Sequence, residues 1–119
     1  MKWGAKGIAA SGLVAMALWV GGCKHEPNPP TEQDAIAVWK NIHDKHHLVE
    51  LISLKKTNGQ MQEVNGTKVY MLYYTATDRA LTDIGSHHAG WIDTNNSNYP
   101  FQWTEKGWQG PDGQVYAEH

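Results

Sequence analysis

The 119-residue sequence has a single cysteine, Cys23. One cysteine excludes an intrachain disulfide, a zinc ribbon and a Cys-x-x-Cys redox site. The sequence also lacks an excess of charge, because 10 Lys and Arg residues stand against 12 Asp and Glu residues, giving a formal net charge of −2. Nucleic-acid binding depends on a clustered basic surface, so this balance argues against nucleic acid as a partner. The content of 40% hydrophobic and 18% charged residues is typical of one small globular domain.

Common catalytic motifs are absent as well. The sequence contains no Gly-x-Ser-x-Gly, no phosphate-binding loop and no His-Glu-x-x-His. The candidate acid–base side chains are Asp78, Asp83 and Asp93, which fall in or beside a stretch expected to be a loop. Carboxylates in such positions are mostly solvated. We therefore expect a protein that is not an enzyme and that carries no cofactor.

The longest apolar run, residues 7–20, is too short to span a bilayer as a helix. It follows Lys2 and Lys6, and it ends in the small residues Gly21 and Gly22 directly before Cys23. A positive segment, a short apolar segment and small residues together form a secretion signal. With the cysteine included, the pattern resembles the lipobox of bacterial lipoproteins, in which signal peptidase II cleaves before a cysteine that carries a diacylglyceryl group.

The lipobox resemblance implies that residues 1–22 are a signal peptide and that lipid on Cys23 makes the membrane a partner. Two or more acyl chains anchor a protein stably. In many Gram-negative lipoproteins an Asp after the cysteine signals inner-membrane retention, so Lys24 implies the periplasmic face of the outer membrane. Residues 23–30 form the lipidated cysteine and a tether rich in proline, which favours extended chain. Residues 31–119 are expected to be a single domain.

This domain is expected to contain one helix followed by an antiparallel sheet. Thr31 is a candidate N-cap, and apolar residues at helical spacing predict a helix over about residues 32–46. Two Asn-Gly dipeptides, at 58–59 and 65–66, are both candidate hairpin turns, and the choice between them stays open. A first strand is expected over 48–54, with the chain leaving the sheet at 55–56, and a second over 68–77. A long loop with a short strand near 91–92 is expected over 78–98. The remaining expected elements are a strand over 99–104, a three-residue hairpin loop at 105–107, a turn at 110–113 and an edge strand at 115–116.

One helix and four or more antiparallel strands predict an α+β domain in which a curved sheet wraps around the helix. This order resembles the cystatin-like and nuclear transport factor 2-like folds. Residues 62–66, Gln-Glu-Val-Asn-Gly, match the Gln-x-Val-x-Gly hairpin loop of cystatins, which blocks the active-site cleft of papain-like cysteine proteases. The resemblance implies an inhibitory role for Gln62, Val64 and Gly66. The Pro-Trp pair of the family's second loop has no counterpart, because Pro100 and Trp103 are separated and fall on an expected strand.

Histidines and aromatic residues allow further interpretations. His43 and His47 are four residues apart, so on one helix their Cβ atoms would lie about 6 Å apart and could share zinc or copper. Tryptophan and tyrosine side chains could line an apolar pocket or fill the core of a small domain. The sequence therefore predicts a lipid-anchored cell-envelope protein with a non-catalytic binding role. Protease inhibition through residues 62–66 and metal binding through His43 and His47 are the alternatives.

Overall fold

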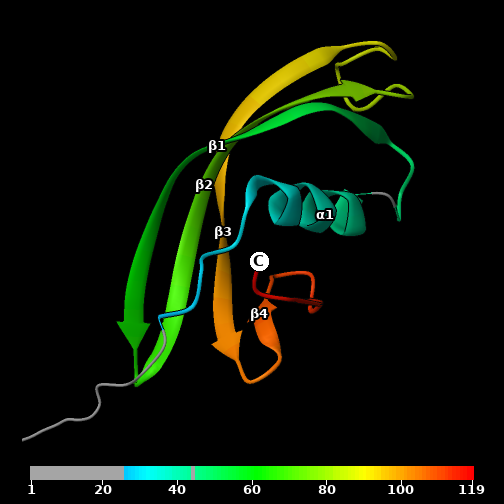
Figure 1. Ribbon diagram of the computed structural model, residues 1–119. Helices are drawn as coiled ribbons and strands as arrows, with labels where there is room; N and C mark the ends of the chain where they lie inside the picture. Colours follow the sequence, from blue (N-terminus) through cyan, green and yellow to red (C-terminus); the bar gives the residue numbers. More distant parts are fainter. Residues whose placement is uncertain (1–25, 44) are drawn as a thin grey trace, which may run out of the picture.

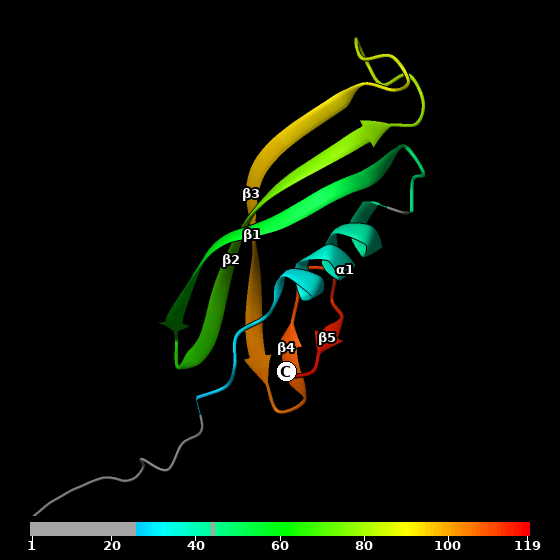
Figure 2. The ribbon, with the colours of Figure 1, turned by 45° about the horizontal axis from the view of Figure 1, so that its top comes forward.

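The computed structural model describes residues 26–43 and 45–119, which form one helix and a five-stranded antiparallel sheet (Figure 1). The first three strands are long and bend together, so the sheet curves around the helix as a half-barrel (Figures 1 and 2). The predicted α+β fold, with one N-terminal helix against a curved antiparallel sheet, is confirmed. The elements, whose strands are neighbours in chain order, are α1 (Glu32–His43), β1 (Val49–Val64), β2 (Thr67–Ala80), β3 (Ile92–Thr104), β4 (Gly107–Gln109) and β5 (Val115–Tyr116).

Helix α1 begins with a reciprocal capping box. The Asp34 amide donates to Thr31 Oγ1 at 3.3 Å, and the Thr31 amide donates to Asp34 Oδ2 at 2.9 Å. The helix ends at His43 instead of residue 46. The His46 amide turns back to the His43 carbonyl at 3.3 Å, and His47 adopts a left-handed φ of 51°, which leads the chain out of the helix and into β1.

The core lies between α1 and the concave face of the sheet. Alternate residues of β2 are buried, starting at Tyr70 and ending at Ala80, with the row interrupted by the half-buried Asp78. This period of two is the pattern of a strand with one face on the core. Six of the ten aromatic residues that the structure describes therefore fill the core, which agrees with one of the two sequence interpretations. The core residues are Ala35, Val38, Trp39, Leu54, Tyr70, Leu72, Tyr74, Ala76, Tyr99, Phe101 and Trp108.

Strand β1 is longer than predicted, because it does not leave the sheet at residues 55–56. Asn58 and Gly59 lie inside it and pair with β2 beside a bulge. A Cβ at Gly59 would overlap the Tyr70 hydroxyl, so glycine is required there by a close approach and not by a turn. The β1–β2 turn is made by Asn65 and Gly66, whose φ angles are 52° and 81°.

Strand β3 also starts earlier than predicted, so the expected loop over 78–98 shrinks to residues 81–91. Its first half is rich in Asn, Ser and Thr, which resembles a loop in composition. These side chains instead bond across the convex face of the sheet, where Thr77 Oγ1 lies 3.0 Å from Thr94 Oγ1. Thr75 Oγ1 likewise donates to Asn96 Oδ1 at 2.6 Å. Such cross-strand pairs stabilise a sheet without apolar side chains.

The C-terminal turns follow the sequence more closely. Thr104 pairs with Gly107, so the β3–β4 turn is the two-residue segment 105–106 instead of the expected three residues. The predicted turn at 110–113 is confirmed, and the Gly113 amide donates to the Gly110 carbonyl at 3.0 Å. Strand β5 lies at the edge of the sheet, also as predicted.

Candidate functional site

The described chain enters the domain at the end of the sheet that carries the β1–β2 and β3–β4 turns (Figures 1 and 2). We call this the hairpin end, comprising residues 62–68 and 103–108. Glu26 pairs with Lys68 at 3.3 Å. The indole Nε1–H of Trp108, which is buried, donates to the Asn28 carbonyl at 2.8 Å. Residues 26–30 of the predicted tether are therefore docked on the domain.

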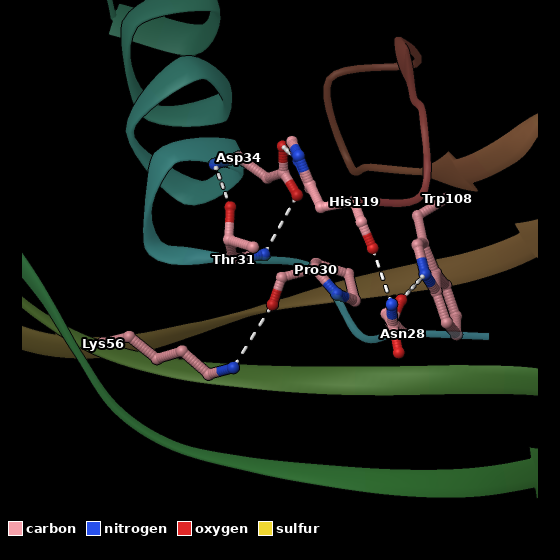
Figure 3. A network of polar contacts seen from close by, with 7 residues as sticks. All are labelled: Asn28, Pro30, Thr31, Asp34, Lys56, Trp108 and His119. Carbon is pink, nitrogen blue, oxygen red and sulfur yellow. Dashed lines mark hydrogen bonds and ion pairs between the residues drawn. The ribbon is translucent and has the colours of Figure 1, made fainter. Parts of the chain in front are cut away.

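Figure 3 shows the polar network that fixes these residues. Asn28 Nδ2 donates to the His119 carbonyl at 2.6 Å, and the His119 imidazole lies 3.0 Å from Asp34 Oδ1. The Asp34 side chain is only 7% exposed and also caps α1. On the other side, Lys56 Nζ donates to the Pro30 carbonyl at 3.2 Å. The segment is thus tied to α1, β1 and the C-terminal residues at once.

The opposite end of the sheet is closed by residues 81–91, which we call the loop end together with the adjoining ends of the strands. Ala80 is bonded twice to this loop: its amide donates to the Trp91 carbonyl at 2.8 Å, and its carbonyl accepts from Gly90 at 2.7 Å. Ile84 and His87 exchange two further backbone hydrogen bonds. These bonds close the loop on itself and define the path of its backbone.

A pocket of about 180 Å³ lies where this loop meets the concave face of the sheet. Its outer wall is an aromatic stack, in which the rings of His87 and Trp91 are parallel to within 4° and 4.4 Å apart. Trp91 is nevertheless 50% exposed. The pocket is lined by Val49, Asp78, Ala80, Ile84, His87, Trp91 and Asp93.

Two carboxylates face this pocket from neighbouring strands. Asp78 continues the inward-facing row of β2, and Asp93 is its direct partner on β3. Burial raises the pKa of Asp78, the adjacent Asp93 raises it further, and His43 lowers it. Asp93 is held by the Thr94 amide, which donates to Oδ1 at 3.0 Å. Such a pair can share a proton or hold a positively charged group.

The sequence predicts solvated carboxylates in or beside a loop, and the structure places only Asp83 in the loop. Asp93 is exposed as predicted but belongs to a strand, and Asp78 is half-buried on a strand. Asp83 is exposed in the loop, where its Oδ1 accepts from the Ala89 amide at 2.9 Å. Asp78 and Asp93 instead lie on strands β2 and β3 and point into the pocket. The alternation of buried residues that begins at Tyr70 could have predicted the position of Asp78. Asp78 lies eight residues after Tyr70, and an even separation on a strand puts both side chains on the same face.

Large exposed apolar side chains gather at the loop end. Ile92 is 55% exposed and pairs with Arg79, so it faces the side of the sheet opposite to Asp78 and Asp93. Leu48 and Leu81 are also exposed and lie together, since the Leu81 amide donates to the Leu48 carbonyl at 2.8 Å. An apolar surface beside a polar pocket is typical of a binding site.

The residues of the cystatin resemblance lie at the hairpin end. Gln62 and Val64 are at the end of β1, next to the β1–β2 turn, and Gly66 is in that turn. Val64 is 48% exposed. Pro100 and Trp103 lie on β3, as expected from their separation.

The histidine pair does not have its expected geometry. Because α1 ends at His43, His47 is not one helical turn away from it. His43 instead stacks on Trp39, with ring centroids 4.2 Å apart. Within residues 26–43 and 45–119, no group of three or more His, Cys, Asp or Glu side chains is placed to hold a metal ion. Cys23 and residues 1–22 lie outside the described residues.

A wider hollow of about 430 Å³ lies between the C-terminal half of α1 and the turn at 110–113. Its polar groups bond to one another: Asn41 Nδ2 and the Tyr116 hydroxyl both donate to Asp112 Oδ2, at 2.8 and 2.5 Å. Burial and the contact with Asp112 raise the pKa of Tyr116. These hydrogen bonds join the helix to the turn and occupy the polar groups of the hollow. The pocket at the loop end is therefore the better candidate for a ligand.

Comparison of the chain with protein-family models, with curated proteins and with solved structures gives no match. Across the part of the chain that the structure describes, no helix is long and apolar enough to cross a membrane.

Proposed function

We propose that this protein is a lipoprotein of the bacterial cell envelope, anchored through lipid on Cys23, that binds its ligand or partner with the loop end. The observation that carries the proposal is the docking of residues 26–30 at the hairpin end. Three residue steps separate Cys23 from Glu26, and they span at most about 11 Å. An anchored Cys23 therefore holds the hairpin end at the membrane surface.

The same geometry turns the loop end away from the membrane. Strand β2 has 14 residues from the hairpin to the loop. At about 3.3 Å per residue, its two ends lie about 43 Å apart along the strand. The exposed apolar residues and the pocket are thus presented to the periplasm, where a partner can reach them. This arrangement supports a binding role for the loop end.

Lipid on Cys23 is tested by mass spectrometry of the full chain expressed in a Gram-negative bacterium. The proposal predicts that the membrane fraction contains a chain that begins at Cys23 and carries the mass of the diacylglyceryl and acyl groups. Cys23→Ser should give an unprocessed chain without lipid. A wild-type protein cleaved at another residue, or recovered without lipid, would overturn the proposal.

A second candidate function is inhibition of papain-like cysteine proteases by the hairpin end. It is favoured by the exposure of Val64 next to the β1–β2 turn. The β1–β2 and β3–β4 turns lie at the same end of the sheet, so the two could enter a cleft together (Figures 1 and 2). The two functions compete for one surface, because anchoring turns this end toward the lipid. The detergent-solubilised protein should then inhibit papain while the same protein in vesicles should not, and Val64→Asp should abolish inhibition. No inhibition by the solubilised protein would exclude this function.

A further inference from the structure

We propose that the pocket at the loop end binds an alkylammonium group, such as the side chain of a lysine presented by a partner. This inference names the ligand chemistry of the binding role proposed above and rests on it. The pocket joins two carboxylates, one aromatic stack and three aliphatic side chains in a single concave site.

The carboxylates provide the charge complementarity. Asp78 and Asp93 are directly opposite on β2 and β3, and both line the pocket. Like charges placed opposite each other on a sheet repel. Arg79, the residue after Asp78, is engaged elsewhere, because it faces the other side of the sheet and pairs with Glu50 at 2.7 Å. His43 at the end of α1 is close enough to lower the pKa of Asp78, and its ring stacks on Trp39. A cation that enters the pocket would relieve the repulsion between the two carboxylates.

The walls suit the rest of an alkylammonium ligand. Trp91 presents an indole ring, and ammonium groups are attracted to the faces of such rings. Val49, Ala80 and Ile84 offer the apolar contacts that a chain of methylene groups requires. The site thus combines two carboxylates with aromatic and aliphatic lining residues.

The size of the pocket limits the ligand further. Pockets for drug-sized molecules measure about 300–1,000 Å³. At about 180 Å³ this pocket accommodates one side chain or a small amine and excludes a larger cofactor. The exposed Leu48 and Leu81 beside it would contact the rest of a protein that carries the lysine.

Three probes test the proposal with the full-length protein in detergent micelles. The probes are N-acetyl-lysine methylamide, the diamine cadaverine and the neutral N-acetyl-norleucine methylamide, and binding is followed by NMR of the tryptophan indole N–H groups. The two ammonium probes should shift the Trp91 indole N–H signal until the shift reaches a plateau at saturation, while the norleucine probe should not shift it. Equal binding of the norleucine probe, or no binding of either amine, would overturn the proposal. The tighter of the two amines identifies the source of the ammonium group.

Matched variants distinguish specific amine binding in the pocket from non-specific attraction of a cation to negative charge. Asp78→Asn and Asp93→Asn should each weaken amine binding at least tenfold. Asp83→Asn removes the same charge from the same end of the molecule but outside the pocket, and should leave the affinity unchanged. An equal loss in all three variants would contradict a specific site.

The proposal can fail independently of the anchor. Detection of lipid on Cys23 together with no amine binding would overturn the ligand and leave the lipoprotein function standing. Amine binding by a protein without lipid would overturn the anchor and leave the pocket standing.

Discussion

Asp78 on β2 lies directly opposite Asp93 on β3, and both side chains face the same pocket. The pair continues the inward-facing row that fills the core beneath α1, so it takes positions where apolar residues would stabilise the sheet. Two like charges at such positions cost stability and favour a ligand of opposite charge.

The first prediction is that removing one charge stabilises the fold. Because burial and, to a smaller extent, the adjacent Asp93 raise the pKa of Asp78, the native state disfavours the ionised form. Asp78→Asn should increase the free energy of unfolding at neutral pH by about 0.2–1 kcal/mol, the usual size of a cross-strand pair term. Urea denaturation measures the change, with Asp83→Asn as the control of equal charge. A loss of stability in Asp78→Asn would contradict repulsion within the pair.

The stability difference should also depend on pH. A carboxyl group with a raised pKa binds its proton more tightly in the native state than in the unfolded state. The contribution of Asp78 to wild-type stability therefore falls as the pH rises from 3.8, the ordinary pKa of the group, through the raised pKa of the native state. The gap between wild type and Asp78→Asn should therefore be largest above this interval and should close below it. Urea denaturation across the acid range checks this, and a gap that widens toward low pH would refute it.

A third prediction concerns the ligand. Amine binding requires the ionised form of Asp78, so the affinity for cadaverine should fall as the pH drops through the raised pKa of this group. Cadaverine keeps its charge over this range, since amines of this type titrate near pH 10. NMR titrations at a series of pH values measure the effect. An affinity that is flat across the acid range would contradict a role for the carboxylates.

The fourth prediction tests the docking of residues 26–30. Trp108→Phe removes the indole N–H that donates to the Asn28 carbonyl, while an aromatic ring still fills the core. Loss of the hydrogen bond should cost about 0.5–1.5 kcal/mol, and the smaller ring adds the cost of a cavity in the core. Amide exchange at Asn28 should become faster. Trp103→Phe is the control, because Trp103 packs against Trp108 and leaves this bond intact. Unchanged exchange at Asn28 in Trp108→Phe would mean that the bond does not hold the segment.

The fifth prediction concerns the bulge in β1. Gly59→Ala places a methyl group on the Tyr70 hydroxyl and should destabilise the fold by about 1–3 kcal/mol, the usual cost of overpacking. The double variant Gly59→Ala with Tyr70→Phe removes the hydroxyl and should recover part of that cost relative to Tyr70→Phe alone. Equal costs in both backgrounds would show that the close approach does not explain the glycine.

The sequence predicts the fold well where local chemistry determines the structure. The Thr31 cap, the helical spacing that follows it and the glycine turn at 110–113 all form as expected. The predictions fail where long-range pairing overrides composition. Residues 92–98 form a strand whose polar side chains bond to β2. Residues 55–64 stay in the sheet because they pair with β2, and Gly59 leaves room for the Tyr70 hydroxyl.

The wrong prediction of a loop over residues 78–98 also explains why the sequence did not predict the pocket. With residues 78–98 expected as a loop, Asp78 and Asp93 had no defined partners, and only the pairing of β2 with β3 brings them together. The contribution of Trp91 depends on a loop closed by backbone hydrogen bonds, which side-chain patterns do not reveal. The docking of Asn28 on Trp108 likewise joins residues 80 positions apart.

The orientation of the anchored protein tests the central claim most directly. In the proposed lipoprotein, lipid would block the thiol of Cys23, the only native cysteine, so a cysteine introduced at exposed Glu63 or Ser86 could be labelled alone with a fluorophore. In vesicles that contain nitroxide-headgroup lipids, the account predicts strong quenching of the label at position 63, at the hairpin end, and little quenching at position 86, in the loop. Equal quenching of the two labels, or stronger quenching at position 86, would contradict it.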